Sequence, residues 1–219
     1  MKCKNIENSL KFYLLCNKLK DLIRTGWKVW NVKRDRIESV AEHIYGVQML
    51  AIAIYKEFEY DLDIEKVIYM LAIHELEEIK IGDLIWHDIA ASEKLEKGKE
   101  AVHSILNGML NIEDVEAMLD EYNNRTTKEA LFAHHCDKLE CDIQAKLYDE
   151  EKCVDINSQS ENNLLANEIV KEKLENEDSW SNAWIEFDRH YYEDDQNFID
   201  IINYLKEYGF LEIKKKSCN

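Results

Sequence analysis

The chain contains no proline and only six glycines among its 219 residues. These two residues supply most tight turns, so their scarcity disfavours strand-and-turn architectures and favours long helices. The hydrophobic fraction of 46% is too high for a disordered chain, although 33% of the residues are charged. At this length one hydrophobic core is sufficient. We therefore expect an all-α protein, with residues 1–219 forming a single helical bundle.

The formal net charge is −17, which argues against a general DNA-binding protein or a protein that binds anionic membranes. No stretch approaches the ~18 uninterrupted apolar residues of a transmembrane helix, and the first ten residues contain no signal-peptide core. The cysteines contain no C-x-x-C pair, and we expect reduced thiols in the cytoplasm. They are Cys3, Cys16, Cys136, Cys141, Cys153 and Cys218.

Apolar spacing predicts an amphipathic first helix over residues 5–24 and a buried second helix over 39–58. Ser39 and Glu42 form the capping-box pattern that starts the second helix. Asp63 can cap a third helix, which we expect to continue through His74 towards Ile79 and to stop near Gly82. This continuity predicts that the side chains of residues 74, 75 and 78 line one cleft.

The rest of the chain also has helical spacing, with a loop predicted at residues 150–162. Further helices are expected at 92–110, 112–122, 126–149, 163–176, 179–193 and 195–208.

Histidine and carboxylate residues occur together at three places in this pattern. They are His43 on the second helix, His74 with Glu75 and Glu78 on the third, and Asp137 on the long helix 126–149. Imidazole nitrogens and carboxylate oxygens from packed helices make a good divalent-metal site. Taken singly, each has a simpler explanation, because most helical histidines are structural and glutamate-rich helices commonly face solvent.

The surrounding segments favour the metal site. The sequences SVAEH (39–43), AIHELEEIKIGD (72–83) and HHCDKLECD (134–142) occur in this order. Together they resemble the H…HD…D signature of the HD-domain metal-dependent phosphohydrolases, most closely the small 5′-deoxynucleotidases. That branch carries an R-T-G-W-type stretch ahead of the first histidine, similar to residues 24–27 here. The resemblance covers about residues 10–150, and helices at about 163–208 complete the domain.

The resemblance implies a role for each matching residue. The metal ligands would be His43, His74, Glu75 and Asp137. Glu78 would manage the proton of the nucleophilic water, and Arg24, Trp27 and Asp83 would contact the phosphate and the substrate. The implied activity is removal of phosphate from (deoxy)nucleoside 5′-monophosphates by a homodimer. It requires one divalent ion, which could be Mn, Co, Mg, Zn, Fe or Ni.

One departure from the signature lies in the doublet, where Glu75 stands in place of the usual aspartate. The extra methylene moves the carboxylate oxygens by about 1.5 Å. Because both carboxylates ligate metals through oxygen, we expect coordination to survive with altered affinity. A literal His-Asp pair also occurs at His87-Asp88, but it follows the Gly82 stop and has no glutamate three residues on.

The overall acidity conceals a basic segment at residues 20–36, which holds six lysines and arginines against two aspartates, a local charge of +4. Such a segment beside His43 would attract a small phosphate. Arg24 is the best candidate to bind it, because guanidinium can form two parallel hydrogen bonds to phosphate. Trp27 and Trp30 could stack on a base, although a packing role for each is equally consistent with the sequence.

Two alternatives remain open. A two-metal HD phosphodiesterase or di-iron oxygenase would need additional histidines between the doublet and Asp137. The available residues, His87, His103, His134 and His135, lack the required spacing. The second alternative is a degenerate HD module that binds a nucleotide without turnover, which the presence of Glu78 and Arg24 disfavours.

Overall fold

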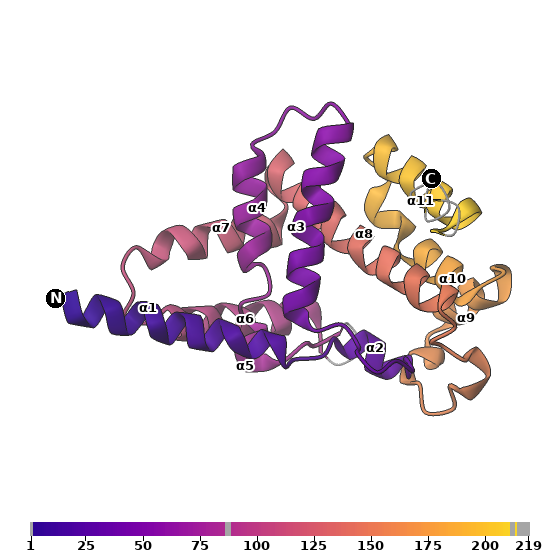
Figure 1. Cartoon of the computed structure of the whole chain (residues 1–219), viewed down its shortest axis with the longest axis horizontal. Helices are drawn as coiled ribbons and strands as arrows, with labels where there is room; N and C mark the ends of the chain where they lie inside the picture. The colour runs from indigo at the N-terminus through magenta and orange to yellow at the C-terminus, as the bar shows by residue number, and fades with distance from the viewer. Residues whose placement is uncertain (1, 86–88, 211–212, 214–219) are drawn as a thin grey trace. The chain divides into compact units, whose positions relative to one another are not determined.

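The computed structural model describes residues 2–85, 89–210 and 213. Within these residues the regular elements are all helices, apart from one isolated antiparallel β-bridge between Ile23 and Ser39 (Figure 1). The predicted all-α class is confirmed. Over the same ranges, no helix combines the length and the apolar character needed to cross a membrane.

The chain divides into two compact units, Met1–Gly26 with Glu38–His134 and Trp27–Ile37 with His135–Asn219. Two helices span the boundary between the units, α2 (Thr25–Val29) and α8 (Lys128–Glu150). The other elements of the first unit are α1 (Lys2–Cys16), η1 (Asn17–Lys20), α3 (Val40–Glu57), α4 (Ile64–Ile73), α5 (Glu78–Ile81), α6 (Ala91–Leu106) and α7 (Ile112–Asn124).

The two helices that carry the predicted histidines start where the sequence places their caps. At the start of α3, the Glu42 amide donates to Ser39 Oγ at 3.3 Å, and Glu42 Oε2 accepts from the Ser39 amide at 2.9 Å. At the start of α4, Asp63 Oδ1 accepts from the amide of Glu65 at 3.0 Å. These bonds satisfy amides that have no partner within the helix. The capping box and the Asp63 cap are both confirmed, and α3 and α4 pack side by side (Figure 1).

The third predicted helix is shorter than expected. It ends at Ile73, and a turn over residues 74–77 separates it from the short α5. In this turn the Leu76 amide donates to the Ile73 carbonyl at 3.0 Å, and the Glu78 amide donates to the Glu75 carbonyl at 3.2 Å. These bonds reach back three residues instead of four, which tightens the backbone and breaks the α-helical repeat. The expectation that residues 74 and 78 project from one continuous helix was therefore wrong.

The first predicted helix also ends early. α1 stops at Cys16, and the 3₁₀ helix η1 follows it to Lys20. Ile23 then lies in an extended segment paired with Ser39, instead of at the end of a helix. The apolar residues keep their helical spacing up to Ile23, so the sequence pattern alone did not show that this residue pairs with Ser39.

The core of the first unit gathers apolar side chains from α1, α4, α6 and α7 and from the turn after α4. Its buried members are Ile73, Leu76, Val102, Leu106 and Leu119, with Phe12 and Cys16 of α1 packed against them. This core holds the turn at 74–77 in place, because Ile73 just before the turn and Leu76 within it are both buried.

The second unit has an aromatic core. The Trp27 ring lies 5.2 Å from Tyr148 and 5.0 Å from Trp184, between ring centroids, and Trp30 lies 5.6 Å from Trp180. The remaining elements of this unit are η2 (Ile156–Ser158), η3 (Asn163–Ala166), α9 (Glu168–Asn176), α10 (Trp180–Asp188), η4 (Arg189–Tyr192) and α11 (Gln196–Tyr208).

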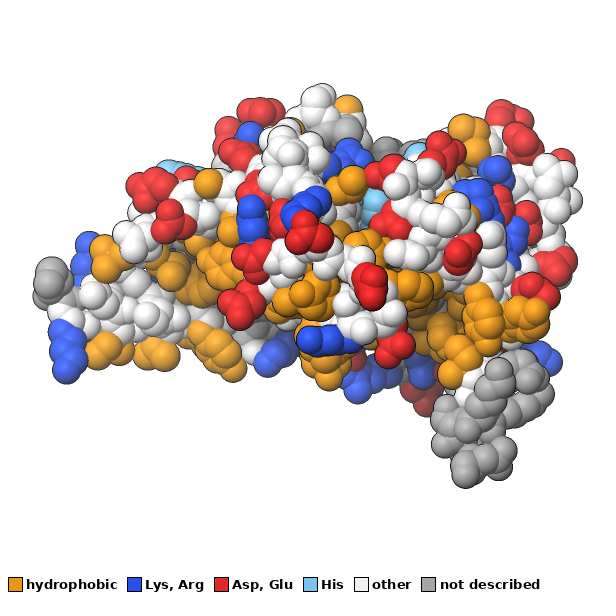
Figure 2. All heavy atoms as spheres, turned by 90° about the horizontal axis from the view of Figure 1, so that it is seen from above, with side chains coloured by type: hydrophobic (Ala, Val, Ile, Leu, Met, Phe, Trp, Pro, Cys, Tyr) orange, Lys and Arg blue, Asp and Glu red, His pale blue; other side chains and the backbone are white. Residues whose placement is uncertain are grey.

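On the face drawn in Figure 2, acidic side chains are scattered in many places, and lysines, arginines and hydrophobic side chains lie between them. This distribution agrees with the net charge of −17. A surplus of negative charge of this size repels a long polyanion.

Candidate metal centre

His43 reaches the candidate site from the first turn of α3, one turn after the Ser39 cap. Its side chain is fully buried. The helix start is also held from outside, because the Val40 amide donates to the Leu22 carbonyl at 2.8 Å. The cap and this bond together fix the direction in which the imidazole leaves the helix.

His74 follows the last residue of α4, and its ring is anchored by the backbone of that helix. Nδ1 lies 2.8 Å from the carbonyl oxygen of Leu71. A carbonyl oxygen can only accept a hydrogen bond, so Nδ1 carries the proton and the neutral ring presents the lone pair of Nε2. Metal-binding histidines commonly donate their other ring N–H to a backbone carbonyl in this way.

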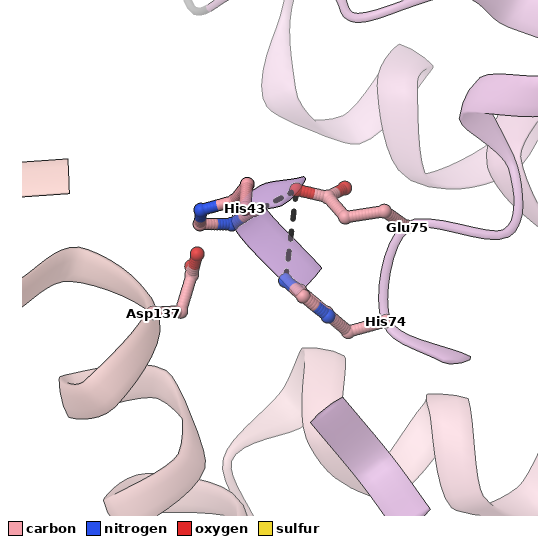
Figure 3. Close-up of side chains that lie close together, drawn as sticks. All are labelled: His43, His74, Glu75 and Asp137. Atoms are coloured by element: carbon pink, nitrogen blue, oxygen red, sulfur yellow. Dashed lines mark ion pairs between the residues drawn. The ribbon is translucent and has the colours of Figure 1, made fainter. Parts of the chain in front are cut away.

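Glu75 brings a carboxylate oxygen to both imidazoles, as the dashed lines in Figure 3 show. Its Oε1 lies 3.8 Å from His43 Nε2 and 3.7 Å from His74 Nε2. Two metal–ligand bonds of about 2.0–2.2 Å can span up to about 4.2 Å, so these separations suit ligands that share one ion. Two nitrogens and one oxygen with this spacing therefore fit a divalent metal.

Asp137 is the fourth member of the candidate ligand set and is drawn with the other three in Figure 3. It lies on α8, in the part of that helix that belongs to the second unit, and its side chain is buried. Within that unit its Oδ2 is 3.1 Å from Lys138 Nζ. Lys138 therefore places a positive charge beside this buried carboxylate.

Glu78 is buried in the first unit, with only 2% of the residue exposed. Burial raises its pKa well above the usual value, the charges of Glu75 and Asp83 raise it further, and those of Arg24 and Lys94 partly oppose the shift. Its Oε2 has no hydrogen-bond partner among the described residues. This shift favours the protonated form of the Glu78 carboxyl, the form that could donate a proton.

Arg24 contacts the candidate ligand Glu75 directly. Its Nη1 donates to Glu75 Oε1 at 3.3 Å, and both side chains are largely buried. The next residue, Thr25, is tied to Asp83, because its amide donates to Asp83 Oδ2 at 2.5 Å and its hydroxyl to the Asp83 carbonyl at 2.6 Å. The segment that begins at Arg24 is thus joined to the segment that follows α5.

Trp27 is placed differently from a base-stacking residue. Only 1% of it is exposed, and its ring packs against Tyr148 and Trp184 in the second unit. Trp30 is also buried, against Trp180. These contacts describe the packing role that the sequence left open for both tryptophans. A direct contact between Trp27 and a substrate stays a prediction.

Glu77 is a feature that the sequence analysis missed. Burial raises its pKa to about 7, and the neighbouring charge of Glu75 adds to the shift. The consecutive glutamates at 77 and 78 resembled a solvated helix face, so nothing in the sequence marked them as enclosed. Lys94 of α6 lies close to both carboxyls, and its Nζ donates to the Leu84 carbonyl at 2.7 Å.

The other histidines have different surroundings. His103 is exposed and lies 2.8 Å from Glu116 on α7, and buried His135 lies 3.1 Å from Asp194 in the second unit. His134 packs its ring near Tyr122, with 6.5 Å between centroids. The alternative doublet His87-Asp88 lies outside the described residues.

The model of the HD domain family matches residues 16–180, three quarters of the chain. The chain belongs to the HD-domain family. This HD domain is 33% identical over 154 residues to the 5'-deoxynucleotidase HDDC2 of Dictyostelium discoideum, covering 67% of this chain and 80% of that protein. It is 31% identical over 149 residues to the Danio rerio protein of the same name, covering 66% and 72% of the two chains.

Solved structures have the same fold. The PH0347 protein of Pyrococcus horikoshii OT3 superposes with a TM-score of 0.63 over 89% of this chain and 96% of its own, at 22% identity. A predicted metal-dependent phosphohydrolase from Magnetospirillum magnetotacticum MS-1 has a TM-score of 0.56 at 25% identity, over 65% of this chain and 71% of its own. The HD-domain architecture therefore extends beyond the three sequence motifs.

Proposed function

We propose that this HD domain is a metal-dependent phosphomonoesterase that removes phosphate from (deoxy)nucleoside 5′-monophosphates. The observation that carries the proposal is the convergence of His43 Nε2, His74 Nε2 and Glu75 Oε1 in the unit that also holds the buried carboxyl of Glu78. Relatives at about 30% identity are 5'-deoxynucleotidases by name, which supports the choice of substrate class.

We propose His43, His74, Glu75 and Asp137 as the ligands of one divalent ion. Support for Asp137 comes from the course of α8. The Tyr122 ring lies between His74, at 5.4 Å, and His134, at 6.5 Å, all within the first unit. Asp137 follows His134 by three residues, and side chains three apart on a helix share a face.

The candidate ligands match the needs of phosphate ester hydrolysis. When bound, a divalent ion neutralises phosphate charge and lowers the pKa of a bound water. The mixed nitrogen and oxygen donors of this site are compatible with Mn, Co, Mg, Zn, Fe or Ni. We propose a single ion, because His103 and His135 are engaged with Glu116 and Asp194.

Glu78 would supply the proton for the leaving group. Its burial favours the protonated carboxyl, which would donate that proton to the 5′-oxygen as the ester bond breaks. The resulting carboxylate would then accept a proton from the next water. A carboxyl exposed to solvent would be ionised at neutral pH and could not begin this cycle.

Arg24 and Asp83 are the proposed contacts to the substrate. The guanidinium of Arg24 can bind two phosphate oxygens in parallel, and Asp83 is held in the same region by its bonds to Thr25. We propose that Trp27, from its buried position, anchors the Arg24–Trp27 segment. The substrate would be a small nucleotide, since the charge of −17 disfavours nucleic acid.

We also propose that the protein acts in the cytoplasm as a homodimer. Cys3, Cys16, Cys136, Cys141 and Cys153 form no disulfide within the described residues, as is usual in a reducing compartment. The outer face of α1 supports self-association, because Leu10, Tyr13 and Leu14 are exposed there. Light scattering coupled to size exclusion would test the mass of the particle in solution.

The test is a divalent-metal screen against a panel of nucleoside monophosphates. Metal-free protein is loaded with each ion in turn, and inorganic phosphate released from dAMP, dGMP, dCMP and the corresponding ribonucleotides is measured. We expect metal-dependent release and about one ion per chain. A content near two ions per chain would favour the two-metal enzyme, and tight nucleotide binding without phosphate release would favour the degenerate module.

A further inference from the structure

One arginine lies against the unusual ligand of the doublet. Arg24 Nη1 is 3.3 Å from Glu75 Oε1, the same oxygen that lies 3.8 Å from His43 Nε2 and 3.7 Å from His74 Nε2. Glutamate has one more rotatable bond than the aspartate expected here, so its carboxylate has more positions to sample. The Arg24 contact is made to the one carboxylate oxygen that faces both imidazoles.

Hydrogen bonds hold the backbone on both sides of Arg24. Its own amide donates to the Glu38 carbonyl at 3.1 Å, and the Leu22 carbonyl accepts from the Val40 amide at 2.8 Å. On the other side, the Thr25 amide donates to Asp83 Oδ2 at 2.5 Å. Bonds on both sides therefore hold Arg24 beside the start of α3, where His43 is located.

We propose that Arg24 is a positioning residue for Glu75, holding its carboxylate at the metal site and compensating for the longer side chain. This role rests on the proposed function and adds to phosphate binding by Arg24. An aspartate at position 75 would end about 1.5 Å short of the present oxygen. Its separation from Arg24 would then be too long for a hydrogen bond.

The guanidinium has an opposing effect, because its positive charge repels a divalent cation. The repulsion between Arg24 and the metal ion is present whether residue 75 is glutamate or aspartate. The hydrogen bond that would position the carboxylate, by contrast, can form only with the longer glutamate side chain. A double-mutant cycle separates the two effects, because the common repulsion cancels in the coupling.

The experiment measures Co²⁺ affinity, from the visible absorption of the bound ion, in the intact chain and in Arg24→Gln, Glu75→Asp and the double variant. Hydrogen-bond partners of metal ligands typically contribute about 10- to 100-fold to metal affinity. We expect the loss caused by Arg24→Gln to be at least about tenfold greater with Glu75 than with the Glu75→Asp chain. Equal losses in both backgrounds would overturn the positioning role.

Two further variants test whether the effect comes from the geometry of the guanidinium and whether it is specific to Arg24. Arg24→Lys keeps the charge but cannot reproduce the geometry of the guanidinium, so it should also weaken Co²⁺ binding more with Glu75 than with the Glu75→Asp chain; equal effects would again overturn the proposal. Arg189→Gln breaks an arginine–glutamate pair with Glu186 of 2.8 Å in the other unit and should leave the affinity unchanged. A comparable loss in this control would attribute the effect to general stability and overturn the proposal.

The outcome is distinguishable from failure of the proposed function. If the unsubstituted chain binds no Co²⁺, the metal site itself is refuted, and the positioning role is overturned with it. If it binds Co²⁺ and releases phosphate from nucleotides while the cycle shows no coupling, only the positioning role fails.

Discussion

Replacing Glu78 with glutamine should have opposite effects on activity and on stability. The carboxyl is buried and its pKa is raised by burial, by Glu75 and by Asp83, so the folded protein prefers it neutral. Glutamine has nearly the same shape and is neutral at every pH. The substitution therefore removes a proton donor without opening a cavity.

General acid–base catalysis is worth about 10²–10⁴ in rate, so kcat should fall by that factor, or about 2.7–5.5 kcal/mol. In the folded protein the pKa of Glu78 lies well above 4.5, the ordinary value for glutamate. Its stabilising effect is complete below that pH and is lost as the pH rises towards the folded pKa, by up to about 1.4 kcal/mol per pH unit. Glu78→Gln should lack this loss.

The assay combines phosphate release from dAMP with urea unfolding of metal-free protein between pH 4 and pH 8. Glu77→Gln is the matched control, because the Glu77 pKa is also raised, to about 7, by burial and by Glu75. We expect the control to reduce the loss of stability with pH while keeping most of the activity. If Glu78→Gln keeps more than about a tenth of kcat, Glu78 is not the proton donor. If the stability profiles of the variant and the intact chain coincide, the Glu78 carboxyl is not held neutral by burial.

Three further outcomes are expected. His74→Ala should lower the bound metal and the melting temperature together, and a chelator should no longer shift that temperature; an unchanged chelator response would contradict the ligand assignment. Asp188 is buried and its pKa is raised to about 6, first by burial, so the free energy of unfolding should fall by up to about 3 kcal/mol from pH 4 to pH 7, and Asp188→Asn should flatten this profile in urea titrations. Ser39→Ala should cost about 1 kcal/mol of unfolding free energy, measured in urea, because the cap of α3 is lost; no change would mean that the cap does not stabilise the helix.

The helix starts could be predicted because they depend on neighbours in the sequence. Ser39 and Glu42 are three residues apart, and Asp63 caps the amides of Glu65 and Lys66, two and three residues on. The motif segments also predicted His43, His74 and Glu75 as one group, and the structure brings these three together. Local hydrogen bonds and short motifs carry this information whatever the rest of the fold does.

The break after α4 could not be predicted in the same way. Residues 74–79 keep a helical pattern, and the turn depends on burial of Ile73 and Leu76 against residues of α6 and α7 that are distant in sequence. The enclosure of Glu77 and Glu78 has a similar origin, since Gly98 of α6 lies directly against Glu77. Burial set by distant segments leaves no periodic signal in a run of charged residues.

The partner of His74 Nδ1 is a main-chain oxygen, that of Leu71. Every residue type presents a carbonyl at that position, so no single side-chain replacement at position 71 can abolish the acceptor. Amino-acid substitutions within α4 should therefore leave the orientation of the His74 imidazole unchanged, provided that the helix still ends at the same residue. An insertion or deletion between Asp63 and His74 would change the length of α4 and should therefore displace the His74 ring.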